Sequence, residues 1–233
     1  PPWTPSAWPS MYTGVNPGQH GVYGFIDFDG YDWEVVSADH VQEHSLWSLL
    51  DRHGISSVVV NVPVTSPPEE IDGAIVPGFI GPEDPPCQPS GILDDVRDAI
   101  GEYRVYPDYT RGCTDRSDAE KMAEYRRLVR MRGEAFRYLV DRFDPGFGFV
   151  EFQKTDTVFH EFDGDEEKVE SVYETTDEQI GKILDAHDPD TVILASDHGM
   201  GPYEKSEFRV NEFLRDKGFV ETTKGGRGMP AWN

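Results

Sequence analysis

Ile55-Ser56-Ser57-Val58-Val59-Val60-Asn61 is the stretch that decides the fold. Its apolar residues are mostly β-branched and run without polar alternation, which is typical of a strand buried on both faces of a parallel sheet. Residues 147–152 and 191–195 have a similar character. We therefore predict that these three stretches are strands of one mostly parallel sheet in an α/β domain.

Helical patterns lie between these strands. The longest begins at Ser117, where Ser-x-x-Glu with Glu120 has the form of an N-terminal capping box, and Pro145 stops it. Shorter helices are predicted at 45–52, 90–100, 166–186 and 207–217, and the Pro- and Gly-rich stretch 63–89 is predicted to be a loop. Strands that alternate with helices imply a sheet covered on both faces.

The charge of the chain narrows the classes of partner. Among 233 residues, 44 Asp and Glu stand against 21 Lys and Arg, which gives a formal net charge of −23. The negative net charge argues against binding to nucleic acids or anionic membranes. The sequence also contains no run of eighteen apolar residues, the length needed to span a bilayer. The 13 Phe, 10 Tyr and 5 Trp argue against a disordered acidic tail.

The acidic excess also bears on the surroundings of the protein. Carboxylates spread along the whole chain repel one another in dilute buffer, and molar salt screens that repulsion because the Debye length falls to roughly 3 Å. We therefore expect the salt-rich cytoplasm of a halophile, with an ordinary acidic soluble protein as the alternative. The two cysteines, Cys87 and Cys113, are too few for a disulfide framework and fit cytosolic thiols, with a single bridge as the alternative.

Two Asp–His pairs follow predicted strands, which is where an α/β sheet places its ligands. Asp156 and His160 are four residues apart, so a helical turn after the strand would put both on one face. Asp197 and His198 leave the strand 191–195 at a Gly-bearing turn. Such ligands suit zinc, with manganese or magnesium as alternatives. Two pairs predict two divalent ions, as in phosphoryl-transfer sites.

Each candidate also has a plain structural interpretation. Asp-x-x-x-His is commonly a surface pair on a helix, and Asp-His-Gly can be a loop with an Asx turn. A nucleophile candidate is Thr4, which we expect at a helix N-cap with Pro5 as the first helical residue. A hydroxyl there can face a bound phosphate, although Thr is also a common N-cap without a further role.

Motifs along nearly the whole chain carry a family resemblance. They are, in order, Thr4-Pro5-Ser6-Ala7-Trp8, Thr13-Gly14-Val15-Asn16-Pro17-Gly18-Gln19-His20-Gly21, Asn61-Val62-Pro63-Val64-Thr65-Ser66-Pro67-Pro68, Thr155-Asp156…His160, Ser196-Asp197-His198-Gly199-Met200 and Val210-Asn211-Glu212-Phe213-Leu214. Their order and spacing resemble the type I phosphodiesterase/nucleotide pyrophosphatase family of the alkaline phosphatase superfamily, and most of all its archaeal branch. The resemblance implies an alkaline-phosphatase-like α/β core.

The resemblance also implies a role for each candidate. Thr4 matches the nucleophile that forms a phospho-enzyme. Asp156 and His160 match ligands of the first metal ion. Asp197 and His198 match ligands of the second metal ion, which in the family also binds the nucleophile oxygen.

Three features depart from the family pattern. The family has a further Asp after an upstream strand and a further His near the C-terminus, and we expect both outside the segment from Pro1 to Asn233, whose ends read as cuts through a larger chain. No signal peptide is visible. Phe25 stands where the nucleotide-pyrophosphatase branch often has Asn, so the resemblance implies diester chemistry without fixing nucleotide selectivity.

These observations predict one catalytic domain over 1–233, incomplete at both ends, with an insertion or cap region at about 32–144. Its expected function is metal-dependent hydrolysis of phosphodiester or pyrophosphate bonds in a small phosphorylated substrate, through a phospho-threonine at Thr4. Three alternatives stay open: a phosphomonoesterase or phosphotransferase of the same superfamily, a non-catalytic relative that binds an ion or partner, and an acidic domain without a site.

Overall fold

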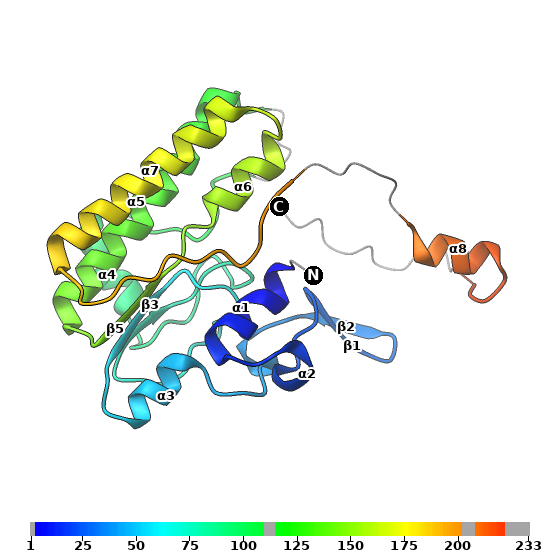
Figure 1. Cartoon of the computed structure of the whole chain (residues 1–233), viewed down its shortest axis with the longest axis horizontal. Helices are drawn as coiled ribbons and strands as arrows, with labels where there is room; N and C mark the ends of the chain where they lie inside the picture. The colour runs from blue at the N-terminus through cyan, green and yellow to red at the C-terminus, as the bar shows by residue number, and fades with distance from the viewer. Residues whose placement is uncertain (1–2, 110–114, 202–207, 222–233) are drawn as a thin grey trace.

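A three-stranded parallel sheet lies at the centre of the computed structural model, which describes residues 3–109, 115–201 and 208–221. Its strands are β3 (Ser57–Val60), β4 (Gly73–Val76) and β5 (Phe147–Val150), in the order β4-β3-β5. Helices cover both faces of the sheet (Figure 1). The prediction of an α/β fold with a mostly parallel sheet is therefore confirmed.

One face of the sheet packs against α4 (Ile92–Ile100) and α5 (Asp118–Phe143). Val58 and Val60 are fully buried on this side, in the largest apolar cluster of the described residues. Helix α7 (Glu166–His187) lies along α5, farther from the sheet (Figure 1). This layering explains why the central strand is apolar at every position after Ser57.

The opposite face is covered by α1 (Thr4–Thr13) and α3 (Leu46–Arg52). Val59 points to this side and packs with Trp8 of α1 and Trp47 of α3. Successive strand residues point to opposite faces, so the Val58–Val59–Val60 run supplies both cores. Helix α1 is thereby fixed against the sheet, which places its N-terminus near the carboxyl ends of the strands.

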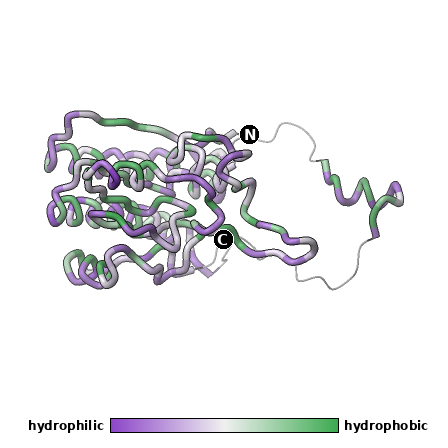
Figure 2. The backbone as a smooth tube through the Cα atoms, turned by 90° about the horizontal axis from the view of Figure 1, so that it is seen from below, coloured by the Kyte–Doolittle hydropathy of each residue, from purple (hydrophilic) through white to green (hydrophobic). Residues whose placement is uncertain are grey.

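The remaining elements are short. They are α2 (Pro17–His20), the antiparallel hairpin of β1 (Ile26–Asp29) and β2 (Asp32–Val35), the 3-10 turn η1 (Ala38–His40), α6 (Lys154–Glu161) and α8 (Val210–Asp216). Figures 1 and 2 show α8 apart from the packed layers. The helix predicted at 207–217 is thus present as α8, and Glu207 lies outside the described residues. No described helix is long and apolar enough to cross a membrane.

The capping box of the long helix is confirmed. The Ser117 hydroxyl accepts a hydrogen bond from the Glu120 N–H at 3.3 Å, and the Ser117 N–H donates to the Glu120 carboxylate at 2.8 Å. The helix ends at Phe143, and Asp144 takes a left-handed conformation with φ 44° before Pro145. Local sequence signals therefore fix both ends of α5.

Strand β4 lies inside the stretch 63–89, so the prediction of a loop over that whole stretch was wrong. Its four residues are all buried, and they pair in parallel with β3. A Cβ on Gly73 would stand 2.0 Å from the Ser57 carbonyl oxygen, so a residue typical of loops is here required by close strand contact. The short apolar run Ala74-Ile75-Val76 was the signal that the surrounding Pro and Gly residues obscured.

The prediction of a strand at 191–195 was also wrong. This segment has no strand assignment and no ladder partner among the described strands. Val192, Ile193 and Leu194 are 48, 83 and 75% exposed. Their β-branched and apolar character favours a strand only where a neighbour supplies hydrogen bonds and packing, and β5 pairs only with β3 in the described sheet.

The range 32–144 contains two of the three strands of the sheet and helix α5. Much of the stretch that we expected to be an insertion or cap therefore belongs to the central layers. The bounds of an insertion within it stay a prediction. Cys87 is a free thiol, and Cys113 lies outside the described residues.

Candidate active site

The N-terminus of α1 directs the Thr4 hydroxyl away from its own helix. The Trp3 carbonyl accepts the first helical bonds, from Ser6 N at 3.1 Å and Ala7 N at 2.9 Å, so Trp3 is the N-cap. The prediction that Thr4 is the N-cap was wrong by one residue. Thr4 Oγ1 instead lies 2.9 Å from Nε2 of His198, 194 residues away in the chain.

The first Asp–His pair lies on α6, which begins soon after β5. Asp156 Oδ1 and His160 Nε2 are 3.4 Å apart, on one face of the helix as predicted. Asp156 Oδ1 is buried and has no hydrogen-bond partner among the described residues. A buried carboxylate oxygen without a donor is energetically unfavourable, so this atom is suited to an added cation.

The second Asp–His pair, Asp197 and His198, lies next to the first. Asp197 Oδ2 and His198 Nε2 are 3.4 Å apart, and His198 Nε2 is 3.9 Å from Asp156 Oδ1. The side chains of Asp197 and His198 are only 14 and 12% exposed, although the segment that precedes them is exposed. The five candidate residues, Thr4, Asp156, His160, Asp197 and His198, thus gather at one place from three parts of the chain.

These separations fit metal ligands. Two ligand atoms about 2.0–2.1 Å from a tetrahedral zinc ion stand roughly 3.3 Å apart, and both Asp–His pairs have 3.4 Å between oxygen and nitrogen. Within the described ranges, however, no group of three or more His, Cys, Asp and Glu side chains forms a metal-binding cluster. The residues present therefore fit two ligands of an ion in each pair and not a complete shell.

The electrostatics of the site also favour a cation. Burial raises the pKa of Asp197 above its ordinary value, and the negative charge of Asp156 raises it further, while the neighbouring His198 lowers it. Two carboxylates that approach each other in a half-buried site are costly to ionise together. A bound divalent ion would remove that cost.

The sequence analysis assigned no role to Glu151. The signal was a charged residue directly after an apolar strand. Glu151 follows β5 and Asn61 follows β3, so they lie side by side at the carboxyl ends of neighbouring strands. Asn61 Nδ2 donates to Glu151 Oε2 at 2.5 Å and to the Glu151 carbonyl at 3.3 Å. Both residues are buried, and Asn61 has φ 66°.

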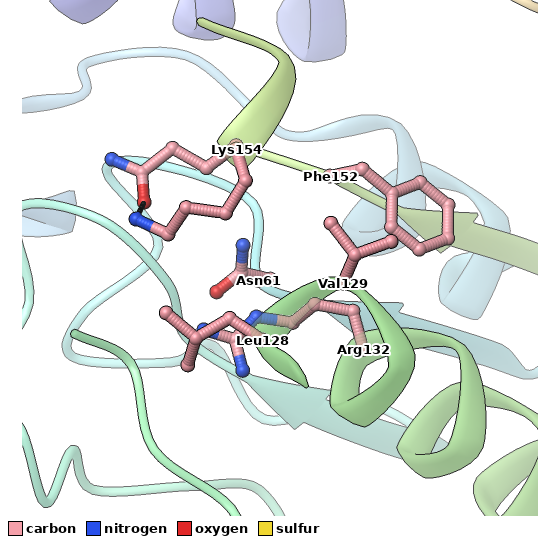
Figure 3. Close-up of a pocket in the computed structure, with 7 residues that line it drawn as sticks. Asn61, Leu128, Val129, Arg132, Phe152 and Lys154 are labelled. Carbon is pink, nitrogen blue, oxygen red and sulfur yellow. Dashed lines mark hydrogen bonds between the residues drawn. The ribbon is translucent and has the colours of Figure 1, made fainter. Parts of the chain in front are cut away.

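Two buried cations, Arg132 and Lys154, line the same small pocket as Asn61 (Figure 3). Arg132 is 2% exposed and donates from Nη2 to the Val105 carbonyl at 2.8 Å, while its Nη1 has no partner among the described residues. Lys154 is 4% exposed. The side chains around this point leave no space for a water molecule.

Burial dominates the protonation of the network. It raises the pKa of Glu151 to about 8 against the opposing effect of Arg132 and Lys154, and it lowers the pKa of Lys154 to about 8. In the unfolded chain Glu151 ionises near the ordinary glutamate pKa of 4.5. The folded protein therefore binds more protons than the unfolded chain between these values, and Glu151 makes stability fall as pH rises through this window.

We expect Glu151→Gln to flatten this pH dependence, because the amide keeps an acceptor for Asn61 and cannot ionise. The stability lost by the wild type between about pH 5 and pH 8, on the order of a few kcal/mol, should be largely absent in the variant. Lys154 stays protonated through most of this window. Urea denaturation of the metal-free protein at constant high salt measures both slopes, and equal slopes would contradict the pKa shift of Glu151.

An aromatic row lies beside Thr4. Trp3 contacts Phe25 with ring centroids 5.4 Å apart, and Phe25 contacts Phe79 at 6.1 Å. Trp3 is 48% exposed. Phe25 is therefore part of an apolar row that begins at Trp3, the residue before the candidate nucleophile.

The fold and these residues define an α/β protein with a candidate hydrolytic site at the carboxyl ends of parallel strands. The model of the family "Type I phosphodiesterase / nucleotide pyrophosphatase" matches residues 1–232, and the chain belongs to this family. The sheet and its flanking helices are consistent with an alkaline-phosphatase-like fold. No curated protein and no solved structure matches the chain. Assignment to the archaeal branch stays a prediction.

Proposed function

We propose that this protein is a metal-dependent hydrolase that cleaves a phosphodiester or pyrophosphate bond with Thr4 as the nucleophile. The 2.9 Å contact between Thr4 Oγ1 and His198 Nε2 is the main observation in favour, because it brings a hydroxyl against a candidate ligand nitrogen. Membership of a phosphodiesterase and pyrophosphatase family supports the reaction class. The expected substrate is a small phosphorylated molecule.

Two divalent ions would be held by this chain's residues, zinc in the first instance, with manganese or magnesium as alternatives. Asp156 and His160 would bind the first ion, and Asp197 and His198 would bind the second together with the Thr4 oxygen. Bound divalent ions supply a Lewis acid that lowers the pKa of a coordinated hydroxyl and offsets phosphate charge.

The proposed reaction has two displacements. Thr4 Oγ1 attacks phosphorus, and the bond to the leaving oxygen breaks with its electron pair on that oxygen. The Thr4 proton passes to solvent, because His198 Nε2 is assigned as a ligand, and the leaving oxygen takes up a proton from solvent. A water oxygen then attacks the phospho-threonine, the bond from phosphorus to Oγ1 breaks, and Thr4 regains a proton. The net change is one water consumed for one ester bond cleaved.

Hydrolysis of bis(p-nitrophenyl) phosphate by the full-length protein with added zinc tests this proposal. We expect faster turnover of this diester than of p-nitrophenyl phosphate, and loss of turnover with a chelator. A faster monoester reaction would favour the phosphomonoesterase or phosphotransferase alternative. Turnover of neither compound, with zinc bound, would favour a non-catalytic relative.

We also propose that the protein works in a salt-rich cytoplasm. Its net charge of −23 supports this, as does the β1–β2 hairpin, where Asp29 stands opposite Asp32; Asp27 also stands opposite Glu34, with His40 Nε2 near both. Like charges across a strand pair destabilise it unless they are screened. The diesterase assay in about 0.1 M and about 2 M KCl should therefore show higher activity in the stronger salt, and the reverse order would contradict the proposal.

A further inference from the structure

A surface hollow of about 420 Å³ opens at the bend between α6 and α7 (Figure 1). It is lined by the end of α6, by the bend itself and by the first turns of α7. The lining residues that bear on its chemistry are Phe159, Asp165, Glu166, Val169, Glu170 and Tyr173. None of them belongs to the candidate active site, and a hollow of this size has room for a small organic molecule.

Two aromatic rings form one corner of the hollow. Phe159 comes from α6 and Tyr173 from α7, and their ring centroids are 6.2 Å apart with 77° between the ring planes. Tyr173 is 49% exposed, and Val169, one turn earlier on the same face of α7, adds an aliphatic side chain. Exposed apolar surface that is gathered in a groove and rimmed by polar residues is typical of a binding site.

The charge around these rings is negative. The lining contains three carboxylates and no Lys or Arg. Asp165 is already engaged, because it pairs with Lys168 and accepts a hydrogen bond from the Lys168 N–H at 3.2 Å as the N-cap of α7. Glu166 and Glu170 are exposed and form no ion pair within the described ranges. Two carboxylates without a counter-charge thus stand beside the aromatic corner.

A neighbouring lysine shows which group satisfies such surroundings. Lys168 Nζ lies 4.7 Å from the centroid of the Phe162 ring, pairs with Asp165, and is 3.1 Å from Asp118 Oδ2. An ammonium group here therefore contacts an aromatic ring and carboxylates at once, an arrangement stabilised by the ring quadrupole and by charge. The hollow offers the same two kinds of group and supplies no cation of its own.

We propose that this hollow binds a small organic ammonium ion, with its alkyl groups against Phe159 and Tyr173 and its charge beside Glu166 and Glu170. Alkylated ammonium ions are weakly hydrated, so aromatic rings replace their water shell at low cost. A bare metal ion fits this lining poorly, because aromatic rings supply no oxygen ligands. The inference is independent of the proposed hydrolase function and of the five candidate site residues.

Calorimetric titration of the full-length protein with tetramethylammonium chloride, at constant KCl concentration and with sodium chloride as the blank titrant, tests the proposal. We expect a dissociation constant in the roughly millimolar range. The neutral compound tert-butanol, of similar size, should bind at least ~10-fold more weakly, because it lacks the charge. Equal binding of the two compounds would show a merely apolar hollow and would overturn the proposal, as would no binding of tetramethylammonium.

Variants of the lining separate the rings from the charge. Tyr173→Leu should weaken tetramethylammonium binding at least ~3-fold, and Tyr173→Phe, which keeps the ring, should stay within about twofold of the wild type. Glu170→Gln should also weaken binding, by roughly threefold.

Glu167→Gln is the matched control for charge, because Glu167 is an exposed acid of the same helical turn that does not line the hollow. It should leave the affinity unchanged. An equal loss in Glu167→Gln and Glu170→Gln would reduce the effect to net charge and contradict the site. Thermal unfolding checks each variant; if Tyr173→Leu lowers the Tm, the comparison of Glu170→Gln with Glu167→Gln still decides.

Discussion

Thr4→Ala should lower the turnover of bis(p-nitrophenyl) phosphate by at least ~10³-fold. Thr4 Oγ1 lies 2.9 Å from His198 Nε2 and does not cap its own helix, because Trp3 is the N-cap residue. The hydroxyl is therefore placed in the candidate site. Removing the hydroxyl removes the proposed nucleophile and leaves in place the four carboxylate and imidazole side chains that we propose as metal ligands. Zinc content should therefore stay near that of the wild type, and assays of turnover with metal analysis of the same sample measure both quantities.

A matched control for this variant lies in the same helix. Thr13→Ala removes a hydroxyl that bonds only to the Pro9 carbonyl, at 2.6 Å, and to the Val15 N–H, at 3.4 Å, among the described residues, and it should keep most of the activity. Thr4→Ser retains a hydroxyl and should recover part of the turnover. Full activity in Thr4→Ala would move the nucleophile to Ser6 or Ser10, the other hydroxyls of the first turns of α1.

Asp156→Ala should weaken zinc binding by more than ~100-fold and abolish turnover. Its Oδ1 lies 3.4 Å from His160 Nε2 and 3.9 Å from His198 Nε2, so a single substitution removes the oxygen that both imidazoles approach. Zinc bound per chain, measured after dialysis, should fall with the activity. The fold should survive, because this oxygen makes no hydrogen bond among the described residues and has only longer contacts with the two imidazoles.

Asp163→Ala provides the comparison for charge alone. Asp163 is an exposed acid just after α6, and its removal changes the net charge by the same amount. We expect its zinc content and turnover to match the wild type. If Asp156→Ala retained full zinc content, Asp156 and His160 would be an ordinary helical ion pair, and the first metal site would have to be abandoned.

Local signals predicted the helices well. The capping box at Ser117 and the stop before Pro145 determine α5 through bonds among neighbouring residues, so the sequence alone contains the information. Strands depend on partners elsewhere in the chain. The run at 191–195 has high strand propensity but no neighbouring strand in the described sheet, while Gly73 has low propensity but fits against Ser57 with no room for a side chain.

In the candidate site, too, contacts between neighbours in sequence could be predicted and contacts between distant residues could not. Asp156 with His160 and Asp197 with His198 are neighbours in sequence, so spacing could predict each pair. The Glu151–Asn61 contact joins residues 90 positions apart, and a single Glu after an apolar strand gives no hint of its partner. The sequence likewise gives no sign that Lys154 is buried, because burial of an ammonium follows from packing and not from local sequence.

The exposed course of residues 191–195 means that the two halves of the site are packed differently. Thr4 and the Asp156–His160 pair stand on helices packed into the core. Asp197 and His198 follow the exposed segment 191–195, whose apolar side chains face solvent. A hydrogen bond between His198 and the Thr4 hydroxyl ties this part of the chain to α1. In the proposed function, an ion held by Asp197 and His198 would also bind the Thr4 oxygen. That ion would therefore join the exposed segment to the packed helix α1, and its binding would depend on both.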